Sequence, residues 1–197
     1  MRGDTTDDAR ARILAAAEEL FGARSYAGTR VSDVAAAAGI ATGSFYRHFP
    51  DKEQLLVEVL RGLNQQLRDA MAVAIDGAGT QREVERRAFT AFFAFLAAHP
   101  HLFRIQRQVE FVAPAAYREY FDELARRYAR GAKDAMIRGE IDPGFDPELI
   151  GFVYLGVAHF AGMRWIEWTG GAAFPDDVAE QLFRLLGRAL APHSDTS

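Results

Sequence analysis

Two short helical segments separated by a glycine are the feature that most constrains how this chain folds. They cover residues 31–38 and 42–48, and Gly39 begins the three-residue break between them. Glycine accepts the left-handed backbone conformation that commonly ends a helix and reverses the chain. Val34 lies on the apolar face of the first segment, and Ile40 and Phe45 are expected to lock the two helices at a fixed angle. The pattern predicts a helix-turn-helix in which the second helix protrudes.

The rest of the chain also shows apolar residues at helical spacing. Alanine, leucine, glutamate and arginine dominate, and alternating runs of β-branched residues are missing, so we expect an all-α protein without a sheet. Capping patterns at Asp51, at Thr80 with Glu83, and at Asp146 mark helix starts. The sequence predicts about nine helices, at residues 7–23, 31–38, 42–48, 51–75, 80–99, about 102–109, 114–138, 146–169 and 175–190. We divide them into a three-helix N-terminal domain, residues 1–54, and a larger helical domain, residues 55–197.

Composition and charge exclude several functional classes. The chain has no cysteine, so it has no disulfide framework, no thiolate zinc site and no cysteine nucleophile. Neither a signal peptide nor a membrane span is expected, and we predict a cytoplasmic protein. The histidines and acids form no metal-binding pattern, and no catalytic residue, metal or cofactor is predicted. The net charge is −4, and the first 54 residues carry seven basic and eight acidic side chains. Bulk charge therefore gives no indication of a nucleic-acid partner.

The stretch from Thr29 to Leu56 resembles the DNA-binding segment of the tetracycline-repressor (TetR) family in residue types and spacing. The motifs that carry the resemblance are Asp33-Val34-Ala35, Ala38-Gly39-Ile40, Gly43-Ser44-Phe45-Tyr46, His48-Phe49 and Lys52-Glu53 with Leu55-Leu56. The resemblance implies that helix 42–48 enters the major groove of double-stranded DNA while the preceding helix supports it. It implies a DNA-binding set of Thr29, Arg30, Ser32, Thr42, Gly43, Ser44, Tyr46, Arg47, His48 and Lys52.

The chemistry of these side chains divides them into two groups. Tyr46, His48 and Lys52 offer a hydroxyl, a ring nitrogen and a charge, which suit sequence-independent phosphate contacts. Thr42, Gly43 and Ser44 are small enough to approach base edges closely, whereas Arg47 can reach either a guanine or a phosphate. Two positions depart from the family pattern: Ala41 and Arg30 stand where Ser or Thr often caps a helix. Thr42 or Thr29 is a candidate substitute for the missing caps.

The two C-terminal helices carry the predicted dimer interface. Helix 146–169 has apolar residues on two faces, one large and aromatic and one built from small residues, so it has to be buried twice. We expect the small-residue face and the last helix to form a twofold four-helix interface. The predicted interface residues are Gly151, Leu155, Ala158, Gly162, Leu182 and Leu186.

An aromatic-rich set in the larger domain predicts a pocket for a small-molecule effector. Effector pockets are mostly apolar with a few polar anchors. The candidate residues are Phe92, Phe93, Phe103, Arg104, Gln108, Tyr120, Tyr128, Phe160 and Arg164. We expect an apolar or amphipathic effector, with a lipid-like carboxylate or an acyl thioester as options, and helix 51–75 as the element that couples the two domains.

Together these features predict a dimeric transcriptional repressor that binds a palindromic operator and is released by a small molecule. The sequence leaves open an activator or a ligand-independent regulator of the same fold. A third hypothesis, a small-molecule carrier or an enzyme that uses the C-terminal cavity, lacks a nucleophile–base pair, a phosphate loop or paired carboxylates.

Overall fold

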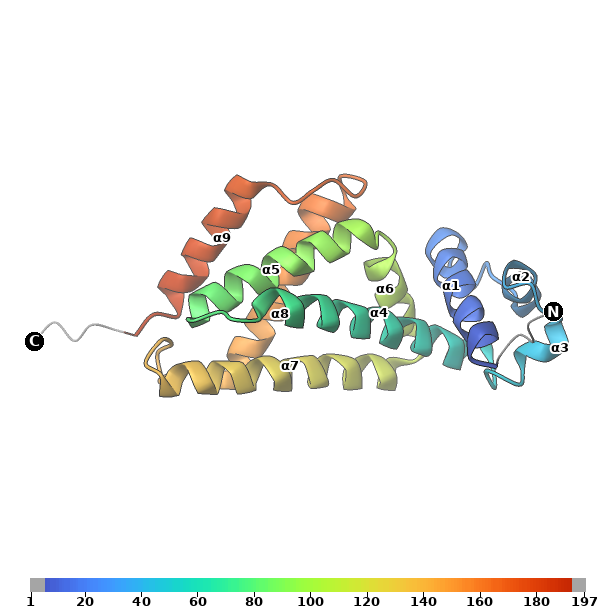
Figure 1. Cartoon of the computed structure of the whole chain (residues 1–197), viewed down its shortest axis with the longest axis horizontal. Coiled ribbons are helices and arrows are strands. Elements are labelled where there is room, and N and C mark those ends of the chain that lie inside the picture. The colour runs from blue at the N-terminus through green and yellow to red at the C-terminus, as the bar shows by residue number, and fades with distance from the viewer. Residues whose placement is uncertain (1–5, 193–197) are drawn as a thin grey trace, which may run out of the picture. The chain divides into compact units, whose positions relative to one another are not determined.

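The computed structural model describes residues 6–192, and these residues form helices without any strand (Figure 1). Nine α-helices and one short π-helical turn account for the described part of the chain. Their bounds are α1 Thr6–Arg24, α2 Val31–Ala37, α3 Thr42–Phe45, α4 Lys52–Ile75, α5 Gln81–Ala98, α6 Leu102–Val112, α7 Pro114–Ile137, α8 Pro147–Gly162, η1 Met163–Glu167 and α9 Asp176–Ala189. The all-α expectation and the number of helices are confirmed.

Local capping signals place the helix starts where the sequence predicts them. The Asp51 carboxylate accepts a hydrogen bond from the backbone N–H of Gln54 at 2.7 Å, and Asp146 accepts one from Glu148 at 2.8 Å. The Thr80 hydroxyl accepts from the Glu83 N–H, while the Glu83 carboxylate reaches back to the N–H of Gly79. Each cap satisfies backbone donors that have no partner inside the helix.

The chain divides into two compact units that do not coincide with the boundary drawn after residue 54. The first unit contains residues up to 66 together with 101–118, and the second contains residues 67–100 and 119 onward. Helix α6 therefore belongs with α1–α3, although it follows α5 in the sequence. This grouping depends on tertiary contacts, which a local sequence pattern does not contain.

In the first unit, α1 packs against α2 and α6, and α2 packs against α3. Phe21, Phe45 and Phe49 are fully or almost fully buried and form the centre of this unit. Gly22 is required on α1, because a Cβ there would lie 2.1 Å from the ring of His101 at the start of α6. The glycine leaves room for the His101 side chain against α1.

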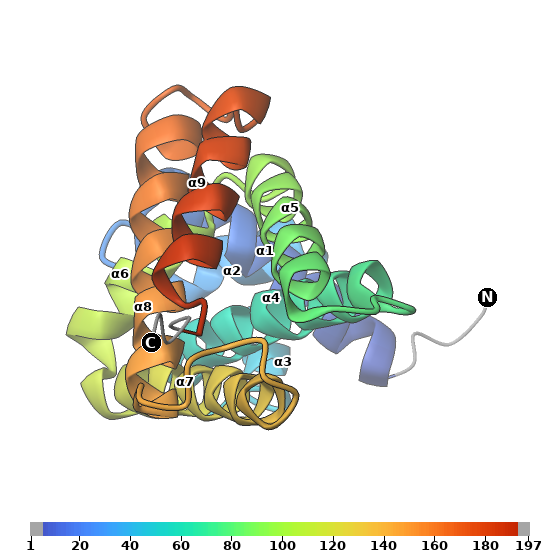
Figure 2. The same ribbon diagram turned by 90° about the vertical axis from the view of Figure 1, so that its left-hand side faces the viewer.

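In the second unit, α5 is the central helix and packs against α8, α9 and η1. Figure 2 shows α8 and α9 in front, with α5 beside them. The rings of Phe93 on α5 and Phe174, in the segment before α9, stack with centroids 3.7 Å apart. Burial of these large apolar side chains is the main contribution to the stability of the unit.

The predicted helix 146–169 changes its winding near its C-terminus. Residues 147–162 are α-helical, and Met163–Glu167 form a π-helical turn, a feature that is often found at functional sites. Within this combined stretch of 21 residues, a window of 18 residues has a mean hydropathy of 1.4, so by length and composition the stretch could span a membrane. This stretch, which reaches the length and hydropathy of a span, was not identified from the sequence. One such helix is weak evidence for a membrane protein, because apolar core helices share these properties.

Candidate DNA interface and effector pocket

The turn between α2 and α3 has the geometry that the sequence predicts. Gly39 adopts a φ of +69°, and the N–H of Ile40 donates to the carbonyl of Ala35 at 3.0 Å. This bond closes a Schellman motif, which ends α2 and satisfies one of its last carbonyl groups. Phe45 on α3 is fully buried, and its ring contacts that of Phe49. The turn thus fixes the orientation of α3 in the first unit.

Helix α3 and the turn that follows it expose several of the residues predicted to contact DNA. Thr42, Gly43 and Arg47 are exposed, and Tyr46 keeps 58% of its surface accessible although it is a large aromatic residue. The Arg47 guanidinium donates to the Ser44 hydroxyl at 2.7 Å, which holds it beside the small residues. Polar and small side chains are therefore gathered on one exposed surface. Arg30 and Ser32, at the start of α2, are exposed as well.

The second helix of the motif is shorter than predicted. Regular α-helix ends at Phe45, and the chain continues through turns. In these turns the backbone N–H of Arg47 donates to the carbonyl of Ser44, and the backbone N–H of His48 donates to the carbonyl of Phe45. No side chain caps α3 at Ala41 or α2 at Arg30. Instead, the Asp33 carboxylate accepts from the Arg30 N–H at 2.9 Å. Neither Thr42 nor Thr29 supplies the missing cap.

Thr29 does not contact solvent, so we remove it from the predicted DNA surface. Its exposed fraction is 0%, and its hydroxyl donates to the carbonyl of Ser25 at 2.8 Å. Ser25 itself has a φ of +70° at the end of α1. Thr29 therefore fastens the loop between α1 and α2, a role that the family resemblance does not indicate.

Lys52 also has internal partners that the sequence does not reveal. Its ammonium group donates to the carbonyls of Tyr26 and Thr29 at 2.8 and 2.9 Å, and it lies 4.0 Å from the centre of the Tyr26 ring. Burial lowers the pKa of Lys52 from its ordinary value. Because two carbonyls and an aromatic face already surround the charge, Lys52 serves first to hold the α1–α2 loop against α4.

Three residues predicted to bind the effector lie in the first unit instead. Phe103 is buried in that unit, and Arg104 is exposed on α6. The Gln108 side chain accepts a hydrogen bond from the backbone N–H of Tyr26 and donates to the carbonyl of Phe21 at 3.1 Å. Gln108 thus ties α6 to the end of α1 and to the loop that follows it. This bond requires residues more than 80 positions apart to meet, so periodicity alone could not indicate it.

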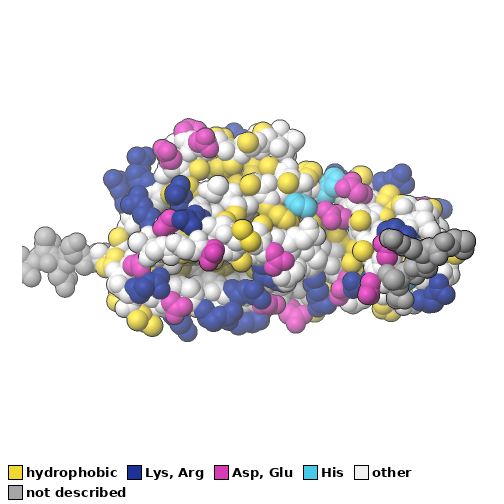
Figure 3. Space-filling model, in the orientation of Figure 1, with side chains coloured by type: hydrophobic (Ala, Val, Ile, Leu, Met, Phe, Trp, Pro, Cys, Tyr) yellow, Lys and Arg dark blue, Asp and Glu magenta, His cyan; other side chains and the backbone are white. Residues whose placement is uncertain are grey.

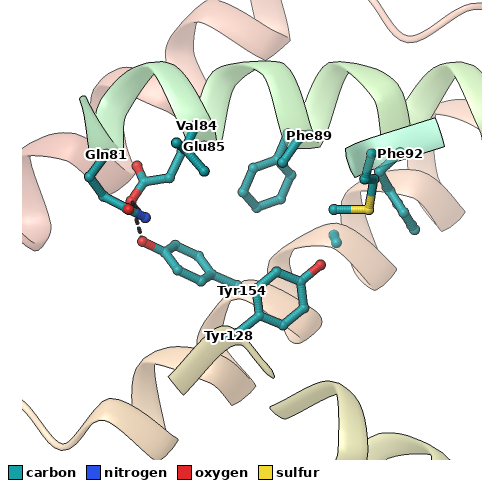
Figure 4. A pocket seen from close by; sticks show the side chains of 10 residues that line it. Gln81, Val84, Glu85, Phe89, Phe92, Tyr128 and Tyr154 are labelled. Carbon is teal, nitrogen blue, oxygen red and sulfur yellow. Dashed lines mark hydrogen bonds between the residues drawn. The ribbon is translucent and has the colours of Figure 1, made fainter. Parts of the chain in front are cut away.

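The second unit contains a cavity lined by residues of α4, α5, α7 and α8, with a volume of about 50 Å³ (Figure 4). Two of the predicted residues, Phe92 and Tyr128, line it. The sequence did not indicate the others, which are Met71, Gln81, Val84, Glu85, Ala88, Phe89, Tyr154 and Ala158.

The polar groups of the cavity centre on Glu85. Its Oε1 accepts hydrogen bonds from the hydroxyl of Tyr154 and from the Gln81 side-chain amide, the second at 3.2 Å. Burial is the main cause that raises the pKa of Glu85, and nearby Glu140 adds to this effect. Burial also raises the pKa of Tyr154 and raises that of Tyr128 to about 12. Both phenols therefore stay protonated at neutral pH and can donate hydrogen bonds.

Four other predicted effector residues do not line this cavity. Phe93 is buried against Phe174, and Tyr120 packs against Phe121 on α7. Phe160 is 66% exposed, and the exposed guanidinium of Arg164 lies over the Trp165 ring. The sequence contained a pattern that could have indicated Glu85. Its carboxylate lies on the face of α5 that otherwise carries the apolar residues Val84, Ala88 and Phe89.

The small-residue face of α8, which was expected from the sequence to form a dimer interface, packs largely within the chain. A Cβ on Gly151 would lie 2.7 Å from the carbonyl oxygen of Ala125, so α7 occupies this face. Ala158, Gly162 and Leu186 are buried too, and Leu155 and Leu182 are partly buried. The open apolar side chains are different residues: Leu149, Phe152, Val153, Phe160 and Leu185. Figure 3 shows hydrophobic side chains gathered near α9 on the visible face of the second unit.

Comparison with known proteins decides the family. The family described as bacterial regulatory proteins, tetR family, matches residues 13–59. The transcriptional repressor KstR2 of Rhodococcus jostii (strain RHA1) is 30% identical over 198 residues, which cover 94% of this chain and 93% of the relative. The chain belongs to the TetR family. The regulator EthR of Mycolicibacterium smegmatis is also 30% identical, over 73% of this chain and 66% of its own.

Solved structures of TetR-family regulators share the fold. The fatty acid degradation regulator FadR from Bacillus halodurans superimposes with a TM-score of 0.80 at 20% identity, covering 90% of this chain and 93% of the other. The ketosteroid regulator KstR2 of Mycobacterium tuberculosis gives a TM-score of 0.67 at 20% identity, covering 96% and 98%. Membership of the TetR family, which the family match and the KstR2 relative show, makes this chain a DNA-binding transcriptional regulator.

Proposed function

We propose that this TetR-family regulator is a repressor that binds a palindromic operator as a dimer and leaves it when a small molecule binds. The observation that carries the proposal is the exposed surface formed by α3 and the turn directly after it. Thr42, Gly43, Tyr46 and Arg47 are open to solvent, while Phe45 between them is fully buried. A short helix fixed by one buried aromatic residue, with small and polar residues outward, suits close approach to base edges.

We assign the DNA contacts to residues that are exposed or partly exposed. Tyr46 and His48 are the proposed phosphate ligands, and Arg30 and Ser32 add contacts from the start of α2. Thr42, Gly43 and Ser44 approach the bases, and Arg47 leaves Ser44 when a guanine or a phosphate is offered. Lys52 is not part of this set, because it holds the α1–α2 loop.

The proposed dimer uses the open apolar face of α8 rather than its small-residue face. Phe152, Gly156 and Phe160 recur every four residues, and exposed fractions of 45% and 66% leave both rings open to water. Leu185 on α9 is 64% exposed. Twofold pairing would cover these side chains, and the same symmetry would be mirrored in the operator.

The cavity of the second unit is the proposed effector site. Helix α5 supplies Gln81, Glu85 and Phe92 to its wall, and the chain then passes through residues 99–101 into α6, which Gln108 fastens to the first unit. Helix α4 also runs from one unit into the other. An effector that favours one arrangement of these helices changes the population that binds DNA. An activator or a ligand-independent regulator of the same fold would use the same DNA surface. We propose that the protein is cytoplasmic in all three cases.

A footprint and a mobility-shift titration on the DNA flanking the gene of this protein test the DNA surface. We expect a palindromic footprint, and the double variant Tyr46→Phe/Arg47→Ala should weaken binding about tenfold or more through two lost polar contacts. Arg86→Ala on α5 is the matched control, since it removes an exposed charge elsewhere and should leave the affinity unchanged. A double variant that binds like the wild type would refute the assignment of α3.

Light scattering tests the dimer separately. We expect a dimer for the wild type and a shift toward monomer for Phe160→Glu, because a charge would be buried in an apolar interface. A wild-type protein that is monomeric at micromolar concentration would contradict the twofold model.

A further inference from the structure

The lining of the effector cavity has an unbalanced charge. Six of its ten residues have apolar side chains, and the remaining four are Gln81, Glu85, Tyr128 and Tyr154. None of the ten is lysine, arginine or histidine. Glu85 is therefore a carboxylate that faces an aromatic and aliphatic cavity without a cationic partner in the wall. Arg82, exposed on α5, has only a minor influence on Glu85.

Two polar groups of the cavity have spare hydrogen-bonding capacity. Oε1 of Glu85 accepts both bonds, from Tyr154 and Gln81, whereas Oε2 has no hydrogen-bond partner among the described residues. The hydroxyl of Tyr128 likewise has no partner within residues 6–192, and in Figure 4 it points away from the Glu85–Tyr154 pair. Glu85 therefore keeps one carboxylate oxygen that could accept a hydrogen bond from an incoming donor.

The aromatic rings around this carboxylate favour the same sign of charge. Phe89, Phe92, Tyr128 and Tyr154 line the cavity, and the ring of Tyr154 meets those of Phe89 and Tyr128 at centroid distances of 6.1 and 5.9 Å. The faces of aromatic rings attract cations. A carboxylate or phosphate group on an effector would instead be repelled by Glu85 in a region of low polarity, where the repulsion is only weakly screened.

We propose that the effector of this regulator is a hydrophobic organic cation, whose ammonium group pairs with Glu85 and lies against the aromatic rings. The proposal rests on the cavity being the effector site. It replaces the lipid-like carboxylate that the sequence had left as an option. The apolar part of the effector extends toward Met71, whose flexible side chain is the lining group best able to move and enlarge the cavity.

Three probes of equal chain length and different charge test the proposal by calorimetry at neutral pH without DNA: n-octylammonium, 1-octanol and octanoate. We expect octylammonium to bind about tenfold more tightly than octanol, and octanoate to bind more weakly than both. In Glu85→Gln, which keeps the shape and the acceptor oxygen, the advantage of octylammonium over octanol should disappear. Glu180→Gln on α9 removes an exposed carboxylate and should keep the wild-type order.

Each outcome decides the matter. Tightest binding of octanoate or of octanol, or an unchanged preference in Glu85→Gln, overturns the cationic effector. If octylammonium binds in the expected order yet fails to release operator DNA, the ligand class stands and the proposed coupling to DNA fails. Since binding is measured without DNA, failure of the two proposals can be told apart.

Discussion

Lys52 in the first unit and Glu85 in the second are both charged groups held partly out of water, but their surroundings differ. Lys52 donates to two carbonyls and lies against the Tyr26 ring. Glu85 receives its hydrogen bonds on one oxygen and leaves the other free beside a cavity. A fully partnered charge stabilises the fold, whereas a half-partnered one retains the capacity to bind something else. The difference separates a structural lysine from a candidate ligand anchor.

The largest effect on stability is expected when Lys52, the fully partnered charge, loses its hydrogen bonds. Lys52→Met keeps much of the apolar stem but removes both bonds to the Tyr26 and Thr29 carbonyls. We expect a loss of about 2–3 kcal/mol in the free energy of unfolding. For a chain of this length about 2–4 °C of melting temperature is lost per kcal/mol. Lys133→Met, at an exposed position on α7, is the control for thermal denaturation. Weaker DNA binding at an unchanged melting temperature would restore the phosphate-contact role predicted from the sequence.

Gln108→Leu tests the second tie in the same unit. The substitution leaves the N–H of Tyr26 and the carbonyl of Phe21 without their side-chain partner, so we expect a loss of about 1–2 kcal/mol. Thermal denaturation measures the loss, and the exposed Gln65→Leu on α4 serves as a comparison. Equal melting temperatures for Gln108→Leu and the wild type would show that α6 is held by apolar packing alone.

Glu85→Gln should stabilise the second unit, and the gain should depend on pH. The folded protein raises the pKa of Glu85 mainly through burial, so it binds the proton more tightly than the unfolded chain does. The wild type therefore loses stability as the pH rises through the folded pKa, and the neutral variant does not. We expect a gain of about 1 kcal/mol at pH 8 that vanishes near pH 4, below the ordinary glutamate pKa of about 4.3. A gain that is constant from pH 4 to pH 8 would argue against a buried carboxylate.

The smallest effect on stability is expected for Tyr128→Phe. Its hydroxyl has no hydrogen-bond partner among the described residues, so its removal should change the free energy of unfolding by less than about 0.5 kcal/mol. Tyr154→Phe loses the bond to Glu85 and should cost about 1 kcal/mol, which makes the two tyrosines a matched pair. Equal melting temperatures for the two variants would remove the distinction between a free and an engaged phenol.

The sequence by itself determined the features that depend on neighbouring residues. The caps at Asp51, Thr80 and Asp146, the left-handed Gly39 and the buried Phe45 each follow from side chains only a few positions apart. The helix-turn-helix was predictable for the same reason, because its whole pattern lies within about thirty residues. Its exposed surface was predicted well at Tyr46 and Arg47.

Only the tertiary structure decided which of the remaining candidates are free to bind. Thr29 and Lys52 are occupied by the α1–α2 loop, and Gln108 is occupied by backbone groups more than 80 residues away in the sequence. The small-residue face of α8 was recognised from the sequence, but only the packing shows that α7 lies against Gly151. Glu85 is held beside a cavity by hydrogen bonds from Gln81 on α5 and Tyr154 on α8. Periodicity tells which face of a helix is apolar, but the neighbour of that face is chosen by packing between distant segments.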